Sequence, residues 1–106
     1  MDAKTFVKQW KIEKSNLLDT YISDDNSYIY QKIQELKLNK QQQLLCNEIL
    51  NEILNEVFYT FLLGLDGSAN IGNGMQELFK LYDENNNLVF ESGDLEVLAY
   101  EDFVEE

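Results

Sequence analysis

Three glutamates recur at four-residue spacing near the middle of the chain: Glu48, Glu52 and Glu56. In a helix this spacing places the three carboxylates on one side, because residues four apart are neighbours on the helix surface. Like charges at this spacing destabilise a helix by about 0.2–0.5 kcal/mol per pair, and no lysine lies between them to relieve the repulsion. The pattern fits either an acidic ridge kept for a basic partner or a solvated face beside a core helix.

Two acidic loops have part of the residue spacing of a calcium-binding EF-hand loop. In the first, Asp66 is followed by Glu77 at the twelfth position, and the second begins at Asp83. An EF-hand needs glycine at position six for its sharp turn, but Ile71 and Leu88 occupy that position here. The glycines of the first loop also lack the Gly-Lys-Ser/Thr sequence of a phosphate-binding loop. We therefore predict no metal site and no cofactor, and we interpret both loops as turns.

The composition removes most catalytic chemistry. The chain has no histidine, and all eight of its basic residues are lysines. Histidine is the commonest general base and transition-metal ligand, so His-based triads, His-containing zinc sites and Glu-x-x-His di-iron sites are excluded. Cys46 is the only cysteine, and its apolar neighbours favour a small hydrophobe over a reactive thiol. We therefore expect no catalytic residues and a protein that is not an enzyme.

The acidic charge is confined to the second part of the chain. Residues 1–40 carry seven lysines against six acids, whereas residues 41–106 carry one lysine against fourteen acids. Phosphate contacts need clustered cations, so binding to nucleic acid or to an anionic membrane is not expected. A basic protein is the natural complement of this surface, although acids that only keep a protein soluble give the same pattern. The lone cysteine and the lack of a signal peptide predict a cytoplasmic protein.

Two helices are expected before the central segment. Asp2 can cap the first, which runs to about Tyr21 on the four- and seven-residue spacing of its apolar side chains. A turn rich in Asp, Asn and Ser follows. A short second helix is then expected to turn Ile29, Ile33 and Leu36 inward.

The third helix is expected from about Lys40 to Leu63. Asn39 can cap it, and Gly64 or Gly67 can end it. It contains the repeat Asn-Glu-Ile-Leu, present twice and followed by Asn-Glu-Val-Phe. Because four residues advance about 400° around a helix, each repeat is rotated by about 40° from the one before. The apolar side chains therefore wind around the helix, and its C-terminal half is predicted to be the centre of the core.

A β-hairpin is predicted beyond the third helix. Residues 77–82 and 88–90 have the apolar character of two strands, and residues 83–87 between them favour a turn. Asp94 is expected to be the N-cap of a short last helix. The expected fold is therefore a single α+β domain over residues 1–106, with three N-terminal helices, a long central third helix among them, a β-hairpin and a short C-terminal helix.

The order of these segments resembles a group of small bacterial proteins that look like immunity proteins encoded beside polymorphic toxins. The similarity is carried by residues 58–67 (FYTFLLGLDG), 79–83 and 93–96, and it spans about residues 41–103. In that group a helix ends in an aromatic-Leu-Leu-x-Leu-Asp-Gly stretch, a hairpin follows, and a short acidic helix closes the chain. The resemblance implies a protein that binds and blocks a toxin domain, and it implies no catalytic residues.

The predicted function is that of a non-catalytic, cytoplasmic binding protein, an immunity-type inhibitor whose acidic surface covers a basic domain such as a nuclease toxin. Two alternatives stay open: a DNA-mimicking inhibitor of a DNA-binding protein, and a structural or regulatory homodimer with no charge-dependent role. The expected partner contacts are acidic side chains and one tyrosine: Glu48, Glu52, Glu56, Tyr59, Asp66, Glu101, Asp102, Glu105 and Glu106.

Overall fold

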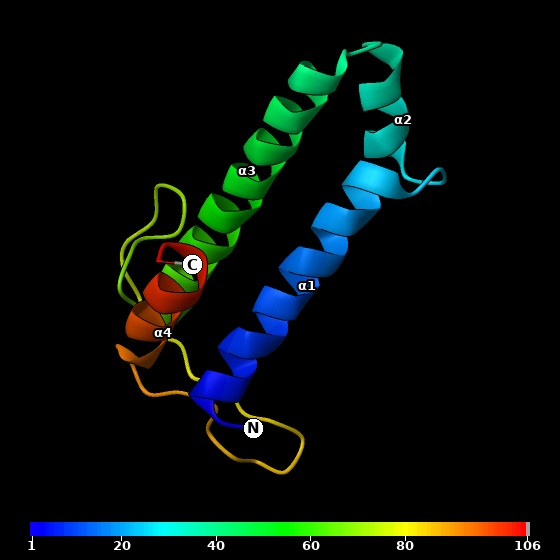
Figure 1. The fold of residues 1–106 in the computed structure, drawn as a ribbon. Coiled ribbons are helices and arrows are strands. Elements are labelled where there is room, and N and C mark those ends of the chain that lie inside the picture. The colour runs from blue at the N-terminus through cyan, green and yellow to red at the C-terminus, as the bar shows by residue number, and fades with distance from the viewer. Residues whose placement is uncertain (106) are drawn as a thin grey trace.

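A computed structural model describes residues 1–105 and contains four helices (Figure 1): α1 over Ala3–Ser23, α2 over Tyr28–Glu35, α3 over Lys40–Asp66 and α4 over Asp94–Phe103. α1 and α3 form the two long arms of an antiparallel hairpin, and α2 joins them at one end. α4 packs against both arms toward the opposite end, near the start of α1.

The helix ends follow the local sequence. The Asp2 carboxylate accepts a hydrogen bond from the Thr5 N–H at 2.8 Å, which caps α1. Asn39 and Gln42 form a capping box at the start of α3. Gly67 ends α3 in the left-handed conformation, with φ 79°, where glycine has no steric penalty. These three ends confirm the predicted caps.

The core lies where α1, α3 and α4 meet. Its buried apolar side chains come from these helices and from the segment just before α4: Val7, Leu54, Phe58, Leu62, Val89, Phe90, Leu95, Ala99 and Phe103. The Phe58 ring lies between Trp10 of α1, at a centroid distance of 5.8 Å, and Phe103 of α4, at 5.6 Å. The prediction that the C-terminal half of α3 is the centre of the core is confirmed.

The predicted α+β fold is wrong, because the described residues contain no strand or sheet. The chain does reverse at residues 83–87, but the pairing is limited to one antiparallel bridge between Tyr82 and Leu88. Residues 89–90 then turn their side chains into the helical core, so the returning segment packs against helices and does not extend a ladder. Residues 76–80, which precede the turn in the chain, stay exposed to solvent. A lone hairpin is only marginally stable in water, and here packing on the helices replaces it.

Two predictions on the short helices are also wrong. Of the three residues predicted to turn inward here, Ile33 is half-buried, whereas Ile29 and Leu36 are exposed, because α2 packs against α1 and leaves its other side open. At the start of α4 the N-cap is Gly93, with φ 97°, and Asp94 is the first helical residue. The cap of this helix therefore has to come from elsewhere in the chain.

The turn at residues 83–87 is organised by the Asp83 carboxylate. This group lies 2.8 Å from the N-terminal ammonium of Met1 and accepts hydrogen bonds from the N–H groups of Asn85 and Asn87. The ammonium group and these N–H donors hold the pKa of Asp83 well below its ordinary value, because they favour the charged form.

We expect this carboxylate to make stability depend on pH. Because its pKa is lower in the folded chain than in the unfolded chain, its stabilising effect is complete above the ordinary aspartate pKa of about 3.9 and is lost as the pH falls below that value. Urea unfolding of the wild-type chain and of Asp83→Asn should differ most around pH 6 and converge toward pH 2. A difference that stays constant over this range would contradict the role given to Asp83.

Candidate protein-binding surface

The Asn-Glu-Ile-Leu repeat of α3 sorts its side chains into rows. The last residue of each repeat faces the core: Leu50 is half-buried, and Leu54 and Phe58 are buried. The glutamates of the repeats form a different row, the acidic ridge, made of Glu48, Glu52 and Glu56, and all three are exposed. The prediction that they share one side of a helix is confirmed by the span of α3.

The acidic ridge borders a hollow of about 520 Å³ between α3 and the end of α4. Two carboxylates and three ring or aliphatic side chains are among its lining residues: Asn51, Glu52, Asn55, Glu56, Tyr59, Phe103 and Val104. The Tyr59 ring lies edge-on to Tyr100 at a centroid distance of 6.4 Å, which supports it in the wall of the hollow. Carboxylates beside aromatic rings suit a lysine or arginine side chain, through charge-assisted hydrogen bonds and cation–π contact.

Asp66 has a structural role that removes it from the expected contacts. The residue is 1% exposed. Its Oδ1 accepts from the Leu95 N–H at 3.0 Å, and its Oδ2 accepts from the Gly93 N–H at 2.9 Å and from the Ser68 hydroxyl at 2.6 Å. α4 has no capping side chain of its own at Gly93, so Asp66 caps α4 from the end of α3. The prediction that Asp66 contacts a partner is therefore wrong, because its carboxylate is used inside the fold.

The C-terminal acids divide into a structural group and an exposed group. Asp102 is 7% exposed and forms an ion pair with Lys8 of α1 at 2.9 Å. Asp102 therefore joins α4 to α1. This structural role replaces the partner contact that was predicted for Asp102. Glu101 and Glu105 are exposed and stay candidate contacts. Glu106 lies outside the described residues.

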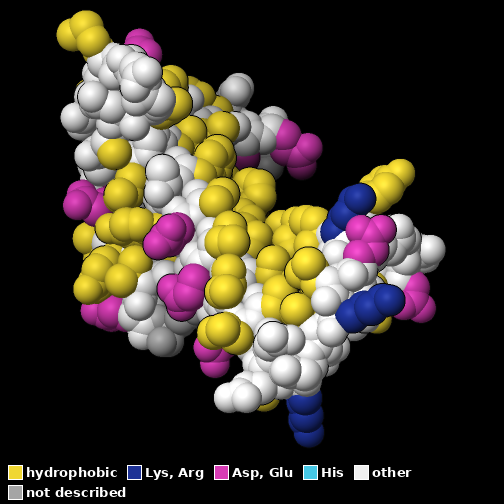
Figure 2. Space-filling view, turned by 90° about the horizontal axis from the view of Figure 1, so that it is seen from above, with side chains coloured by type: hydrophobic (Ala, Val, Ile, Leu, Met, Phe, Trp, Pro, Cys, Tyr) yellow, Lys and Arg dark blue, Asp and Glu magenta, His cyan; other side chains and the backbone are white. Residues whose placement is uncertain are grey.

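A further row of apolar α3 side chains lies at the surface, although Val57 and Phe61 in this row belong to the C-terminal half of the helix that was predicted to be the centre of the core. Five residues at four-residue spacing, called the apolar stripe below, are each at least 50% exposed: Leu45, Ile49, Ile53, Val57 and Phe61. Figure 2 shows hydrophobic side chains gathered in a band across the middle of this view, with Asp and Glu side chains on both sides of the band and lysines on the lobe to one side of it. Contiguous exposed apolar surface of this kind marks interaction sites.

The repeat contains a signal for this stripe. Each repeat carries two adjacent apolar residues, and neighbours in a helix point about 100° apart. α1 and α4 cover the row that contains Leu54 and Phe58, and no further helix within residues 1–105 covers the other row. A helix with two apolar rows buries only the row against which other helices pack, so the second row is left as an exposed stripe. The spacing of the apolar residues alone does not distinguish the two rows.

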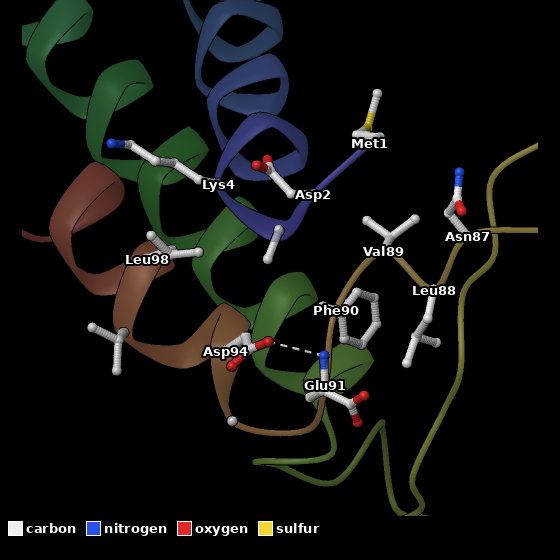
Figure 3. A pocket seen from close by; sticks show the side chains of 13 residues that line it. Met1, Asp2, Lys4, Asn87, Leu88, Val89, Phe90, Glu91, Asp94 and Leu98 are labelled. Carbon is white, nitrogen blue, oxygen red and sulfur yellow. Dashed lines mark hydrogen bonds between the residues drawn. The ribbon is translucent and has the colours of Figure 1, made fainter.

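A larger hollow, of about 840 Å³, lies between the N-terminal residues and the segment 87–98 (Figure 3). Two of its carboxylates are already used by the backbone: Asp94 accepts from the Glu91 N–H at 2.9 Å, and Asp2 caps α1. Its lining residues include no Ser, Thr, Cys or His that could act as a nucleophile. This hollow therefore offers less specific chemistry than the acidic one.

Residues 1–105 provide neither a cluster of metal ligands nor a membrane-spanning helix. No group of three or more His, Cys, Asp or Glu side chains in this range is placed to hold a metal ion. None of its helices combines the length and the apolar character needed to cross a bilayer. The carboxylates that begin the two loops with calcium-like spacing have structural roles, since Asp66 caps α4 and Asp83 organises a turn.

Comparison of the chain with protein-family models, with curated proteins and with solved structures found no match. The acidic ridge, the hollow beside it and the apolar stripe are therefore the features of the molecule that point to a function.

Proposed function

We propose that this chain is a non-catalytic, cytoplasmic binding protein that blocks a basic protein domain, acting as an immunity-type inhibitor of a toxin such as a nuclease. The observation that carries the proposal is the hollow beside α3, where Glu52 and Glu56 lie next to Tyr59 and Phe103. A basic active site presents lysine and arginine side chains, whose charged heads and apolar stems match carboxylates set beside aromatic rings.

The charge and the aromatic rings have different tasks in this proposal. The excess of acids in residues 41–106 attracts a basic domain before contact and speeds association. Exposed salt bridges contribute only about 0–1 kcal/mol each, so the rings of the hollow, where water is displaced, set the dissociation rate. Inhibition then needs no chemistry from this chain, because covering the active site is sufficient.

The direct test uses the protein encoded beside this chain in its genome. Expression of that neighbour alone should stop cell growth, and co-expression of this chain should restore it. The purified pair should form a complex that weakens as the salt concentration rises. A harmless neighbour, or toxicity that this chain does not relieve, would contradict the proposal.

Neutralising the acidic ridge should separate binding from stability. In the triple variant Glu48→Gln, Glu52→Gln, Glu56→Gln, two like-charge pairs at i, i+4 disappear, so the free energy of unfolding should rise by about 0.4–1 kcal/mol. Association with the basic partner, followed by stopped-flow fluorescence at low salt, should slow by about tenfold and lose most of its salt dependence.

The matched control removes three acids outside the ridge, in Glu13→Gln, Asp19→Asn, Asp25→Asn. These residues are exposed on or just after α1, and their loss changes the net charge by the same amount. The control should slow association much less than the ridge variant. Equal slowing would show that only the total charge matters and that the ridge has no specific role.

A further inference from the structure

The molecule exposes more surface than a monomer of its mass ordinarily does. A folded monomer of 12.4 kDa exposes about 6,100 Å², whereas this chain exposes 7543 Å². Its radius of gyration is 16.4 Å, against about 13 Å for a compact domain of this length. The surplus of about 1,400 Å² exceeds the roughly 800 Å² that one partner contributes to a standard interface.

The apolar stripe is open along its length and bordered at both ends. It covers residues 45–61 of α3, which is about 24 Å of helix. At the α2 end, Ile29 and Ile49 line an apolar hollow of about 290 Å³. At the other end the following loop folds over α3, and a Cβ added to Gly64 would lie 2.9 Å from the Ile71 side chain. The space between these borders matches a helix of about sixteen residues.

We propose that the apolar stripe binds one amphipathic helix of the basic partner, with lysine or arginine on the flank that faces the acidic ridge. This inference rests on the proposed function, because it assigns a second contact to the same partner. Rows of residues spaced by four are the ridges that interdigitate when two helices pack. An amphipathic helix lying on an apolar surface uses anchors at this spacing.

Charge complementarity decides what the partner helix carries beside its apolar face. Each glutamate of the ridge directly precedes a residue of the stripe, as Glu48 precedes Ile49 and Glu52 precedes Ile53. The carboxylates therefore run along the border of the stripe, about 100° around the helix from it. A cationic flank on the docked helix neutralises this border, whereas an acidic flank is repelled by it.

A second copy of this chain fits the stripe less well. A symmetric dimer presents the same patch from both subunits. Both acidic ridges would then border one interface between two chains that each have a net charge of −12. A cationic helix brings opposite charge to the same border.

The test uses a synthetic peptide of seventeen residues with leucine at every fourth position, lysine on one adjacent row and alanine elsewhere. A scrambled peptide of identical composition is the comparison, and binding is measured by fluorescence anisotropy. The patterned peptide should bind about tenfold more tightly than the scrambled one. The variant Ile49→Ser, Ile53→Ser should lower its affinity by about tenfold, because two apolar anchors are lost.

The matched control is Ile12→Ser on α1. Ile12 is 53% exposed and Ile53 is 51% exposed, so Ile12→Ser and the single substitution Ile53→Ser remove similar apolar surface, but only Ile53 lies in the stripe. Ile12→Ser should leave the affinity for the patterned peptide within about twofold. Both variants should keep the wild-type circular dichroism spectrum and urea midpoint, because the replaced residues are exposed.

Three outcomes would overturn the proposal. In the first, patterned and scrambled peptides bind equally and both lose binding in the Gln variant of the acidic ridge, which leaves the charge-based function standing without a helix site. In the second, Ile12→Ser weakens binding as much as the stripe variant. In the third, sedimentation velocity shows a dimer that disappears in the stripe variant, which would assign the stripe to a second copy. Because no toxin enters this assay, its failure is distinguishable from a failure of growth rescue.

Discussion

Replacing Asp66 with alanine is expected to lower the free energy of unfolding by about 3–4 kcal/mol, because α4 loses its cap and two N–H groups lose their acceptor. A lost N-cap costs about 0.5–2 kcal/mol, and each buried donor left unsatisfied costs about 1–3 kcal/mol. The Leu95 N–H is buried and the Gly93 N–H is partly buried. Urea unfolding followed by the fluorescence of Trp10, the only tryptophan, measures the loss.

Two control substitutions separate the cap from the charge. Asp66→Asn keeps an acceptor oxygen in the same place and should be less destabilising than Asp66→Ala. Asp94→Ala removes an exposed carboxylate from the first turn of α4, where it accepts from the Glu91 N–H, and should cost less than about 1 kcal/mol. If Asp66→Ala were no more destabilising than Asp94→Ala, the cap role would be wrong.

Replacing Phe58 with alanine should be the most destabilising change among the aromatic residues, at about 3–5 kcal/mol. The residue is 9% exposed, and its ring stacks on Phe103 with an interplanar angle of 11° while also contacting Trp10. The change leaves a cavity where three helices meet and removes aromatic contacts worth about 0.5–1.5 kcal/mol each. Since 1 kcal/mol shifts Tm by about 4–8 °C in a domain of this size, thermal unfolding should show a fall of more than about 12 °C.

The control for Phe58 is Phe61, which lies on the same helix but is 50% exposed. Phe61→Ala keeps the core ring in place and loses one ring contact with Trp10 at 5.9 Å, so its cost should be below about 1.5 kcal/mol. If the two substitutions were equally destabilising, the apolar stripe would belong to the core. The helix-docking proposal would then lose its open surface.

The limits of the long helices were predictable because their signals are local. Asp2, Asn39 and Gly67 each act on backbone groups within a few residues of themselves, and helix ends need such partners wherever the helix lies in the fold. The acidic ridge was predictable for the same reason, since residues four apart share a side of any helix. These predictions needed no knowledge of what packs against what.

The failure of the predicted hairpin could not be foreseen from the sequence, because strand pairing competes with packing on elements that are distant in the chain. Residues 88–90 have strand character in isolation, but Val89 and Phe90 bury their side chains among the helices. A two-stranded ladder gains little in water, while burying a large apolar side chain contributes about 1.5–3 kcal/mol. Packing on the helices is therefore the more favourable use of the same residues.

Sequence alone was sufficient for the net charge, for the exclusion of histidine chemistry and for the long helices, because these depend on residue type or on neighbours within a few positions. The tertiary structure was needed to distinguish acids that hold the fold from acids that face solvent. Asp66 is joined to Leu95, and Asp102 to Lys8, across long stretches of chain, whereas Glu52 and Glu56 stay exposed. It was also needed to show which apolar row of α3 is covered, since a row is buried only where another element packs against it.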